Sequence, residues 1–218
     1  SAIAAWPPSG NAAGAAAHSG CEIETMPRTM DNIGFYSALG FVPGYLTITL
    51  TLEAATSDVA VPLLGALPPR DRREMMQRCQ QLTSELMPGY DFTRELQLTL
   101  ELGLGDVVLR HERGSLAGFA LFHSVPLVEG RSREELRVLK MVLAREGDIS
   151  AMAPLLAGAA RQAGTRRVAI RVQGEYALAY RALIALGARV RWTDLRMVVA
   201  GNEERRASAG LVLSNWEI

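Results

Sequence analysis

The chain has 218 residues, of which 23 are Lys or Arg and 23 are Asp or Glu, so its formal net charge is zero. A neutral chain has no long-range field to attract nucleic acid or an anionic membrane, and we expect neither as a partner. Cys21 and Cys79 lack His or Cys neighbours at ligand spacing, which predicts no metal site and no disulfide framework. Because no apolar run reaches the roughly 20 residues of a membrane helix and no signal peptide is evident, we expect a soluble cytoplasmic protein.

The first half of the chain begins with a segment of low complexity. Residues 1–20 are mostly Ala, Gly, Ser and Pro, a composition typical of a flexible lead. Three elements then follow without a gap: a strand over 21–26, a short helix that starts near Asp31, and a strand over 42–52. Gly40 stands where the end of a helix favours a left-handed residue. The pattern predicts a strand–helix–strand unit.

The remainder of the chain predicts a longer series of elements. A connector with three prolines precedes two helices, and three strands with antiparallel turns come next. A helix, a strand, a second helix and another strand complete the series, and an apolar tail strand lies near the end. The helices are expected over 70–87, 91–102, 150–163 and 176–186, and the strands over 107–112, 116–125, 136–144, 167–172, 190–199 and 210–218.

Two parts of the chain are similar to each other. Aligning Leu39-Gly40-Phe41 with Leu186-Gly187-Ala188 places residues 168–173 opposite 21–26, and residues 192–199 opposite 45–52. The alignment predicts two related strand–helix–strand units. Chance similarity is the alternative, because such units are common in α/β proteins.

The first of these units carries a constellation of side chains. Asn32 is followed by Tyr36 about one turn later, and then by Leu39-Gly40-Phe41. This segment resembles the closing half of a domain of the GNAT superfamily of N-acetyltransferases, and the order of elements from 57 to 200 resembles a whole domain of that family.

The resemblance implies an α/β fold of α+β layout, an acyl-CoA N-acyltransferase-like mixed sheet flanked by helices. It divides the chain into a partial first copy over 1–56, a complete copy over 57–200 and a tail strand over 201–218. The first copy would then begin in its middle, and its strand over 21–26 would need a neighbour. The second domain or another copy of the chain could supply that neighbour, and the tail strand could cover the first half within the chain or across a homodimer.

The resemblance also implies a chemistry. The family transfers an acetyl group from acetyl-CoA to an amine, and its cofactor lies in a gap between two parallel strands that diverge. In the family the Asn helps to hold the strand pair and the pantetheine arm, and the Tyr often protonates the departing thiolate. These roles are expected for Asn32 and Tyr36, although Tyr36 could instead pack beside Phe35 and Phe41. Glu24, on the preceding strand, could orient the amine or act through water as a base.

A loop that binds the pyrophosphate of CoA is a further expectation. In the family it reads Gln or Arg, two residues, Gly, one residue, then Gly or Ala, because bare backbone amides must reach phosphate. Gly10 and Ala12 match only the end of this pattern, and Pro7 stands in place of its Gln or Arg. The alternative is a disordered or shortened remnant of the loop. In the second half only Gly147 matches, since Ala144 replaces Gln or Arg.

The second half departs further from the family pattern. Ile149 would project a branched side chain toward the phosphate, while Glu146 and Asp148 add negative charge that suits a capped helix. The internal alignment places Ala179 opposite Asn32 and Leu183 opposite Tyr36. We therefore expect reduced or lost affinity for the cofactor in this half.

The sequence thus predicts an enzyme that uses acetyl-CoA, with CoA as product, on an amine acceptor that is a small molecule or a peptide. The catalytic parts are expected in the first copy. The alternative is a catalytically inactive interaction or sensor module that keeps the fold without turnover.

Overall fold

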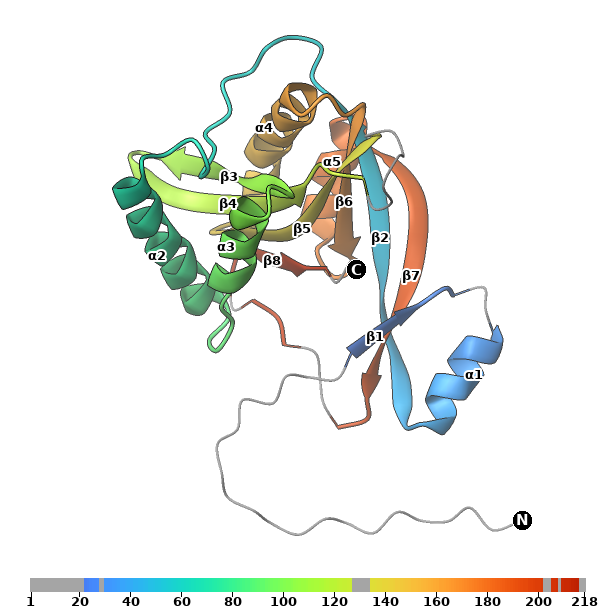
Figure 1. Cartoon of the computed structure of the whole chain (residues 1–218). Coiled ribbons are helices and arrows are strands. Elements are labelled where there is room, and N and C mark those ends of the chain that lie inside the picture. Colours follow the sequence, from blue (N-terminus) through green and yellow to red (C-terminus); the bar gives the residue numbers. More distant parts are fainter. Residues whose placement is uncertain (1–21, 28–29, 127–133, 202–204, 208, 216–218) are drawn as a thin grey trace, which may run out of the picture.

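The computed structural model describes residues 22–27, 30–126, 134–201, 205–207 and 209–215. They form an eight-stranded mixed sheet in the order β1-β7-β2-β6-β5-β4-β3, with β8 paired to β5 (Figure 1). The elements are β1 (Glu22–Thr25), α1 (Met30–Ala38), β2 (Phe41–Glu53), α2 (Pro69–Leu86), α3 (Thr93–Glu101), β3 (Gly105–Glu112), β4 (Ser115–His123), β5 (Glu135–Leu143), the 3-10 turn η1 (Glu146–Asp148), α4 (Ile149–Gln162), β6 (Arg167–Gln173), α5 (Ala177–Ala185), β7 (Arg189–Val199) and β8 (Leu211–Ser214).

The expected α/β fold and the order of its elements are confirmed. α2 starts with Pro69 at its first helical position, where proline costs no backbone hydrogen bond. Gly40 and Gly187 follow α1 and α5 with φ of 91° and 89°, a left-handed conformation that glycine adopts readily. Among the residues that the structure describes, no helix is both long and apolar enough to cross a membrane.

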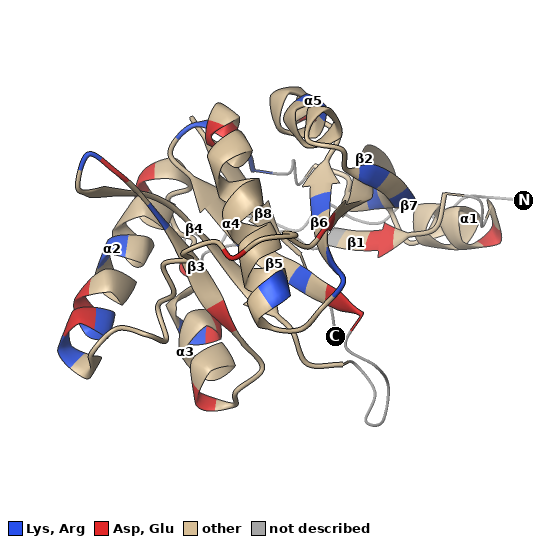
Figure 2. Cartoon of the chain, turned by 90° about the horizontal axis from the view of Figure 1, so that it is seen from above, with Lys and Arg blue, Asp and Glu red and all other residues tan. Residues whose placement is uncertain are grey.

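The sheet separates two hydrophobic cores. α4 and α5 pack on one face around residues such as Met141, Leu156 and Ile170. α2 and α3 cover the β3–β4–β5 part of the other face, where Phe119 and Leu96 are buried (Figure 1). Basic and acidic residues are interspersed along α2 (Figure 2), which is typical of a helix with one solvated face.

β2 lies in the interior of the sheet. It pairs antiparallel with β6 from Thr47↔Gln173 to Glu53↔Arg167, and with β7 along its other edge. β6 and β7 are therefore not neighbours, although α5 connects them directly. One sheet runs across the proposed domain boundary between residues 56 and 57, because a strand from the first segment separates two strands of the second.

The two strand–helix–strand units are related by a pseudo-twofold axis. Equivalent residues of the two units are 147 positions apart, so Glu24 corresponds to Arg171. In the same way, Ile23 corresponds to Ile170 and Leu50 to Met197, so the β1–β7 pair Ile23↔Met197 is equivalent to the β6–β2 pair Ile170↔Leu50. The pair Thr47↔Asp194 maps onto itself and marks the axis. The register of the strands thus has the same offset of 147 residues as the internal alignment. It also shows that β7, from the second half of the same chain, supplies a neighbour for β1.

The tail strand does not lie where it was expected. β8 pairs with β5 in the second half, from Lys140↔Ser214 to Leu143↔Leu211, so the expectation that it covers the first half is wrong. The reason is that β5 and β6 pair for only three positions, Glu135 to Arg137 on β5, which leaves later backbone groups of β5 free for another strand.

Leu50 tests the place of β2 in the sheet. It is 1% exposed and belongs to the core beneath α4 and α5. We expect Leu50→Ala to lower the free energy of unfolding by about 3 kcal/mol, because it leaves a cavity in a packed core. Leu46→Ala, on the same strand at 41% exposure, should cost less than about 1 kcal/mol. Urea unfolding measures both, and equal losses would contradict the buried position of β2.

Candidate functional site

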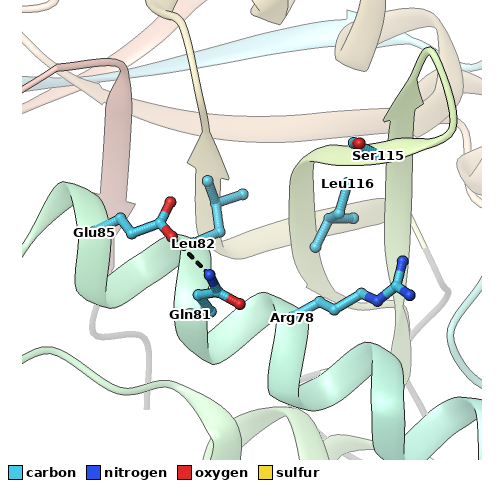
Figure 3. Close-up of a pocket in the computed structure, with 6 residues that line it drawn as sticks. All are labelled: Arg78, Gln81, Leu82, Glu85, Ser115 and Leu116. Carbon is cyan, nitrogen blue, oxygen red and sulfur yellow. Dashed lines mark hydrogen bonds between the residues drawn. The ribbon is translucent and has the colours of Figure 1, made fainter.

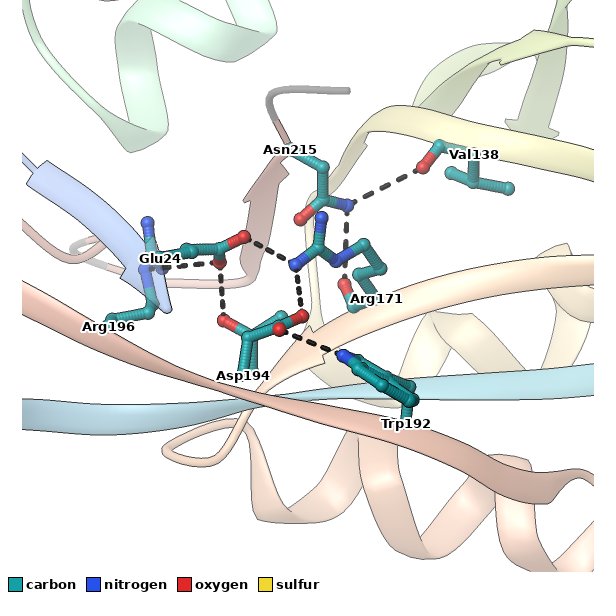
Figure 4. A network of polar contacts seen from close by, with 8 residues as sticks. Glu24, Val138, Arg171, Trp192, Asp194, Arg196 and Asn215 are labelled. Atoms are coloured by element: carbon teal, nitrogen blue, oxygen red, sulfur yellow. Dashed lines mark hydrogen bonds and ion pairs between the residues drawn. The ribbon is translucent and has the colours of Figure 1, made fainter. Parts of the chain in front are cut away.

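A cluster of polar side chains lies at the pseudo-twofold axis (Figure 4). Thr47 Oγ1 donates a hydrogen bond of 2.7 Å to Glu24 Oε1, and Arg171 Nη2 donates one of 2.7 Å to Asp194 Oδ2. These two bonds are equivalent under the shift of 147 residues. Arg171 Nη2 also donates to Glu24 Oε2, which joins the two equivalent positions directly. The cluster therefore links β1, β2, β6 and β7.

Three further residues extend this axial cluster. Trp192 Nε1 donates to Asp194 Oδ1 at 2.9 Å, and Arg196 Nε lies 3.8 Å from Glu24 Oε1. Asn215 Nδ2 donates to the carbonyl oxygen of Arg171 at 3.4 Å. The side chains of Arg171 and Asp194 are only 12% and 14% exposed. Their charges are thus partly shielded from water, so the loss of one partner leaves an uncompensated charge that water cannot fully solvate.

Glu24, the expected base, belongs to this axial cluster. Oε1 accepts from Thr47 and Oε2 accepts from Arg171, so both carboxylate oxygens already have a donor in the chain. Each of these oxygens keeps a second lone pair, which is the position at which Glu24 can accept a proton from a substrate amine or from water.

Asn32 and Tyr36 lie together on α1. They are four residues apart and therefore share one side of the helix. Asn32 is exposed, whereas Tyr36 is half-buried, with its ring centroid 6.0 Å from that of Phe41 in an edge-on contact. α1 contains no fully buried residue, and Phe35 on it is 60% exposed. Both expected side chains are thus accessible from solvent on a helix that rests lightly on β2.

Gly147 lies in η1, in the other half of the molecule from α1, at the start of α4. The acidic residues beside it have partners within the chain. Glu146 Oε1 accepts from the backbone N–H of Ala179 at 2.9 Å and so caps α5, while Asp148 accepts from Arg110 at 3.3 Å and from Arg145 at 3.0 Å.

Two sequence expectations for this turn change. The side chain of Asp148 makes no capping hydrogen bond to α4. The helix that an acidic side chain caps is α5, and the capping residue is Glu146. Ile149 is fully buried in the core and does not project toward a ligand at the turn, so that expectation is wrong. Gly10 and Ala12 lie outside the described residues. The structure therefore brings Asn32 and Tyr36 together, places Glu24 in the axial cluster and puts Gly147 elsewhere.

Lys140 is a residue that the sequence argument missed. It lies on β5, is 4% exposed, and donates from Nζ to Ser214 Oγ at 2.8 Å. Its Nζ also lies 5.1 Å from the ring centroid of Phe92. Burial lowers the pKa of Lys140, and the charge of Glu95 opposes this shift. The available signal was its rarity, because it is the only lysine among 23 basic residues.

A shallow depression opens between α2 and the start of β4 (Figure 3). It is lined by Arg78, Gln81, Leu82, Glu85, Ser115 and Leu116, and Gln81 Nε2 donates to Glu85 at 2.9 Å within it. None of the expected site residues takes part in it. Over the described part of the chain, no three His, Cys, Asp or Glu side chains are placed to hold a metal ion.

Comparisons with known proteins give a match in structure only. No family model matches the sequence, and no curated protein matches it either. A GCN5-related N-acetyltransferase from Sphaerobacter thermophilus is similar in structure with a TM-score of 0.55 and 15% identity, over 89% of this chain and 62% of that one. A putative acetyltransferase from Pyrococcus horikoshii has a TM-score of 0.56 and 16% identity, over 87% and 57%. A GNAT-family acetyltransferase from Colwellia psychrerythraea has a TM-score of 0.53 and 12% identity, over 82% and 64%.

These matches establish the fold. The chain has the fold of the GNAT acetyltransferases, which confirms the resemblance at the level of the fold. It spans about three fifths of the length of the structures that it matches, between 57% and 64%.

Arg171 is the most informative position in the axial cluster. We expect Arg171→Met to lower the free energy of unfolding by about 3 kcal/mol, because Glu24 and Asp194 are left as shielded carboxylates without their shared cation. Arg78→Met is the matched control, since its ion pair with Glu74 is exposed and should contribute less than about 1 kcal/mol. Urea unfolding at neutral pH compares them. Similar small losses would mean that the axial cluster does not stabilise the fold.

Lys140 predicts a pH dependence whose sign follows from its burial. Because its pKa is lowered in the folded state, the unfolded chain binds more protons between that value and the ordinary lysine pKa of about 10.4. The free energy of unfolding should therefore rise with pH through this window, relative to Lys140→Met, and level off above it. Urea unfolding at a series of alkaline pH values measures the difference, and parallel profiles for the two proteins would contradict it.

Proposed function

We propose that this protein, which has the GNAT acetyltransferase fold, transfers an acetyl group from acetyl-CoA to the amine of a small molecule or a peptide. Asn32 is the proposed contact to the pantetheine arm and Tyr36 the proposed acid. Both belong to the first half of the chain. The acceptor amine is expected to approach the same half, with the second half helping to shape the site. A cytoplasmic location and a homodimer stay predictions from the sequence.

The observation that carries this proposal is the pairing of Asn32 with Tyr36 on one side of α1 in this fold. The two side chains precede the Gly40 turn and β2 in the order that the resemblance requires. Exposure supports the assignment, because an amide and a hydroxyl that a ligand must reach cannot be sealed within a core. Tyr36 also contacts Phe41, which limits the directions in which its hydroxyl can point.

The proposed reaction assigns each group a step. The neutral amine attacks the thioester carbonyl carbon, a C–N bond forms and the C–S bond breaks. The hydroxyl of Tyr36 gives its proton to the departing sulfur, and the proton of the amine leaves through water. Glu24 is the proposed final acceptor of that proton, at a lone pair that the hydrogen bonds from Thr47 and Arg171 leave unused.

Tyr36→Phe tests the assignment of the acid. With acetyl-CoA and a panel of amine acceptors, we expect thiol release to slow by about 100-fold while the dissociation constant of acetyl-CoA changes by less than about twofold. Tyr180→Phe is the matched control, because Tyr180 is a half-buried tyrosine on the equivalent helix of the second half. It should leave both quantities unchanged.

Two results would contradict the proposal in different ways. An unchanged rate in Tyr36→Phe would make Tyr36 a packing residue while leaving the activity intact. Failure of the native chain to bind acetyl-CoA in isothermal titration would contradict the activity itself, and would leave the non-catalytic module as the function of the fold.

A further inference from the structure

The parallel strands β5 and β6 diverge early, and β8 enters the gap between them (Figure 1). The two strands pair from Glu135↔Arg167 to Arg137↔Ala169 only. From Lys140 to Leu143, β4 still pairs with one edge of β5, and β8 pairs with the other edge in antiparallel register. A strand that starts against β6 therefore continues against the tail of the chain.

β8 is buried on both of its faces. Leu211 and Leu213 are 0% exposed and belong to the core beneath α4 and α5, whereas Val212 is buried in the core beneath α2 and α3. Burial removes the apolar surface of these side chains from water and so stabilises the tail in this position. Gly210 precedes β8 with φ of 71°, and a Cβ there would lie 2.2 Å from the carbonyl oxygen of Leu143. The tail thus enters the sheet along a path that only glycine permits.

Asn215 closes the gap at its far end (Figure 4). Its backbone N–H donates to the carbonyl of Leu139 at 2.8 Å. Its Nδ2 lies 3.5 Å from the carbonyl oxygen of Val138 on β5 and 3.4 Å from that of Arg171 on β6. One side chain therefore spans both diverging strands and uses a backbone oxygen of each.

Side chains hold the tail in addition to the strand hydrogen bonds. Lys140 Nζ donates to Ser214 Oγ at 2.8 Å, and the hydroxyl of Tyr176 donates to the carbonyl of Val212 at 3.4 Å. These bonds come from β5 on one side and from the turn before α5 on the other. The tail is fixed to both walls of the gap.

We propose that residues 211–215 occupy the gap between β5 and β6 as a permanent part of the fold, in the place that the family resemblance assigns to an acyl-CoA arm. The pantetheine arm of acyl-CoA is an extended chain with amide groups, so it needs the same free backbone groups of β5 that β8 uses. The second half therefore binds its own C-terminal strand in place of a cofactor. Acetyl-CoA binding under the proposed function is confined to the first half.

The turn beside the gap agrees with this assignment. The carboxylates of Glu146 and Asp148 at η1 make their contacts within the chain, to the backbone N–H of Ala179 and to Arg110 and Arg145. Of the phosphate-loop pattern, the sequence keeps only Gly147 at this turn. The gap is filled, and the turn at its end is held by internal contacts.

The single lysine gives a direct test on the native chain. In protein labelled with [13Cε]lysine, the one side-chain signal reports Lys140 and, through Ser214, the position of β8. We expect this signal to stay unchanged when acetyl-CoA is added at millimolar concentration. Amide hydrogen exchange at residues 211–215 should be as slow as in β5, with and without acetyl-CoA. A shifted lysine signal together with faster exchange at these residues would show that the cofactor displaces the tail, and would overturn the proposal.

A reversible lock provides a second test. Val142 and Val212 lie opposite each other in the register of β5 and β8. In Cys21→Ser protein, Val142→Cys with Val212→Cys should form a disulfide on oxidation that fixes the tail in place. We expect the oxidised and reduced forms to bind acetyl-CoA with affinities within about twofold of each other. A loss of about tenfold or more on oxidation, reversed by reduction, would overturn the proposal.

The two proposals fail separately. If the chain does not bind acetyl-CoA but residues 211–215 exchange slowly and the lysine signal is unchanged, the proposed function fails and the filled gap stands. If acetyl-CoA binds and displaces the tail, the filled gap fails and the activity stands.

Discussion

The structure depends on the insertion of β2 between β6 and β7. Without β2, these two strands would each present a free edge in the middle of the sheet, where unpaired backbone groups favour association with other chains. β2 satisfies both edges and also brings Leu50 into the main core. The first strand–helix–strand unit is therefore attached to the second by backbone pairing on both sides of one strand, and the two units cannot separate without breaking the sheet.

The axial cluster explains why two related units can pair so closely without being identical. Positions 24 and 171 are equivalent under the pseudo-twofold relation and contact each other near the axis. If both carried Glu, or both carried Arg, like charges would face each other in a partly buried place. Because position 24 is Glu and position 171 is Arg, the contact is an ion pair. Two identical units could not form it. Thr47 and Asp194 repeat the pattern, because each bonds to the charged residue of its own unit.

The two halves differ at the equivalent helix positions, both in residue type and in how exposed the side chains are to solvent. The first half presents Asn32 and the partly buried Tyr36 on a lightly packed helix, while the equivalent positions of the second half, Ala179 and Leu183, are fully buried. The second half also contains the filled gap between β5 and β6, with Lys140 buried against the tail.

Local sequence determined the elements, their order and the relation between the two units. Alternating and helical periodicities set the strands and helices to within a few residues, Gly40 and Gly187 marked the two helix ends, and the alignment of Leu39 with Leu186 gave the offset that the register later matched. The approximate place of Asn32 and Tyr36 on one helix followed from their spacing. Such features depend on neighbours along the chain, which periodicity reports directly.

Only the tertiary structure decided which strands became neighbours. The sequence of β2 suits any interior position of a sheet, and the apolar pattern of β8 suits any free edge. Periodicity therefore could not show that β2 lies between β6 and β7, or that β8 pairs with β5. The partners of Glu24 were hidden for the same reason, since Arg171 lies 147 residues away and meets it only when β1, β7, β2 and β6 align. Hydrogen bonds between strands form wherever backbone edges are free and both faces can be buried, and that condition belongs to the whole sheet.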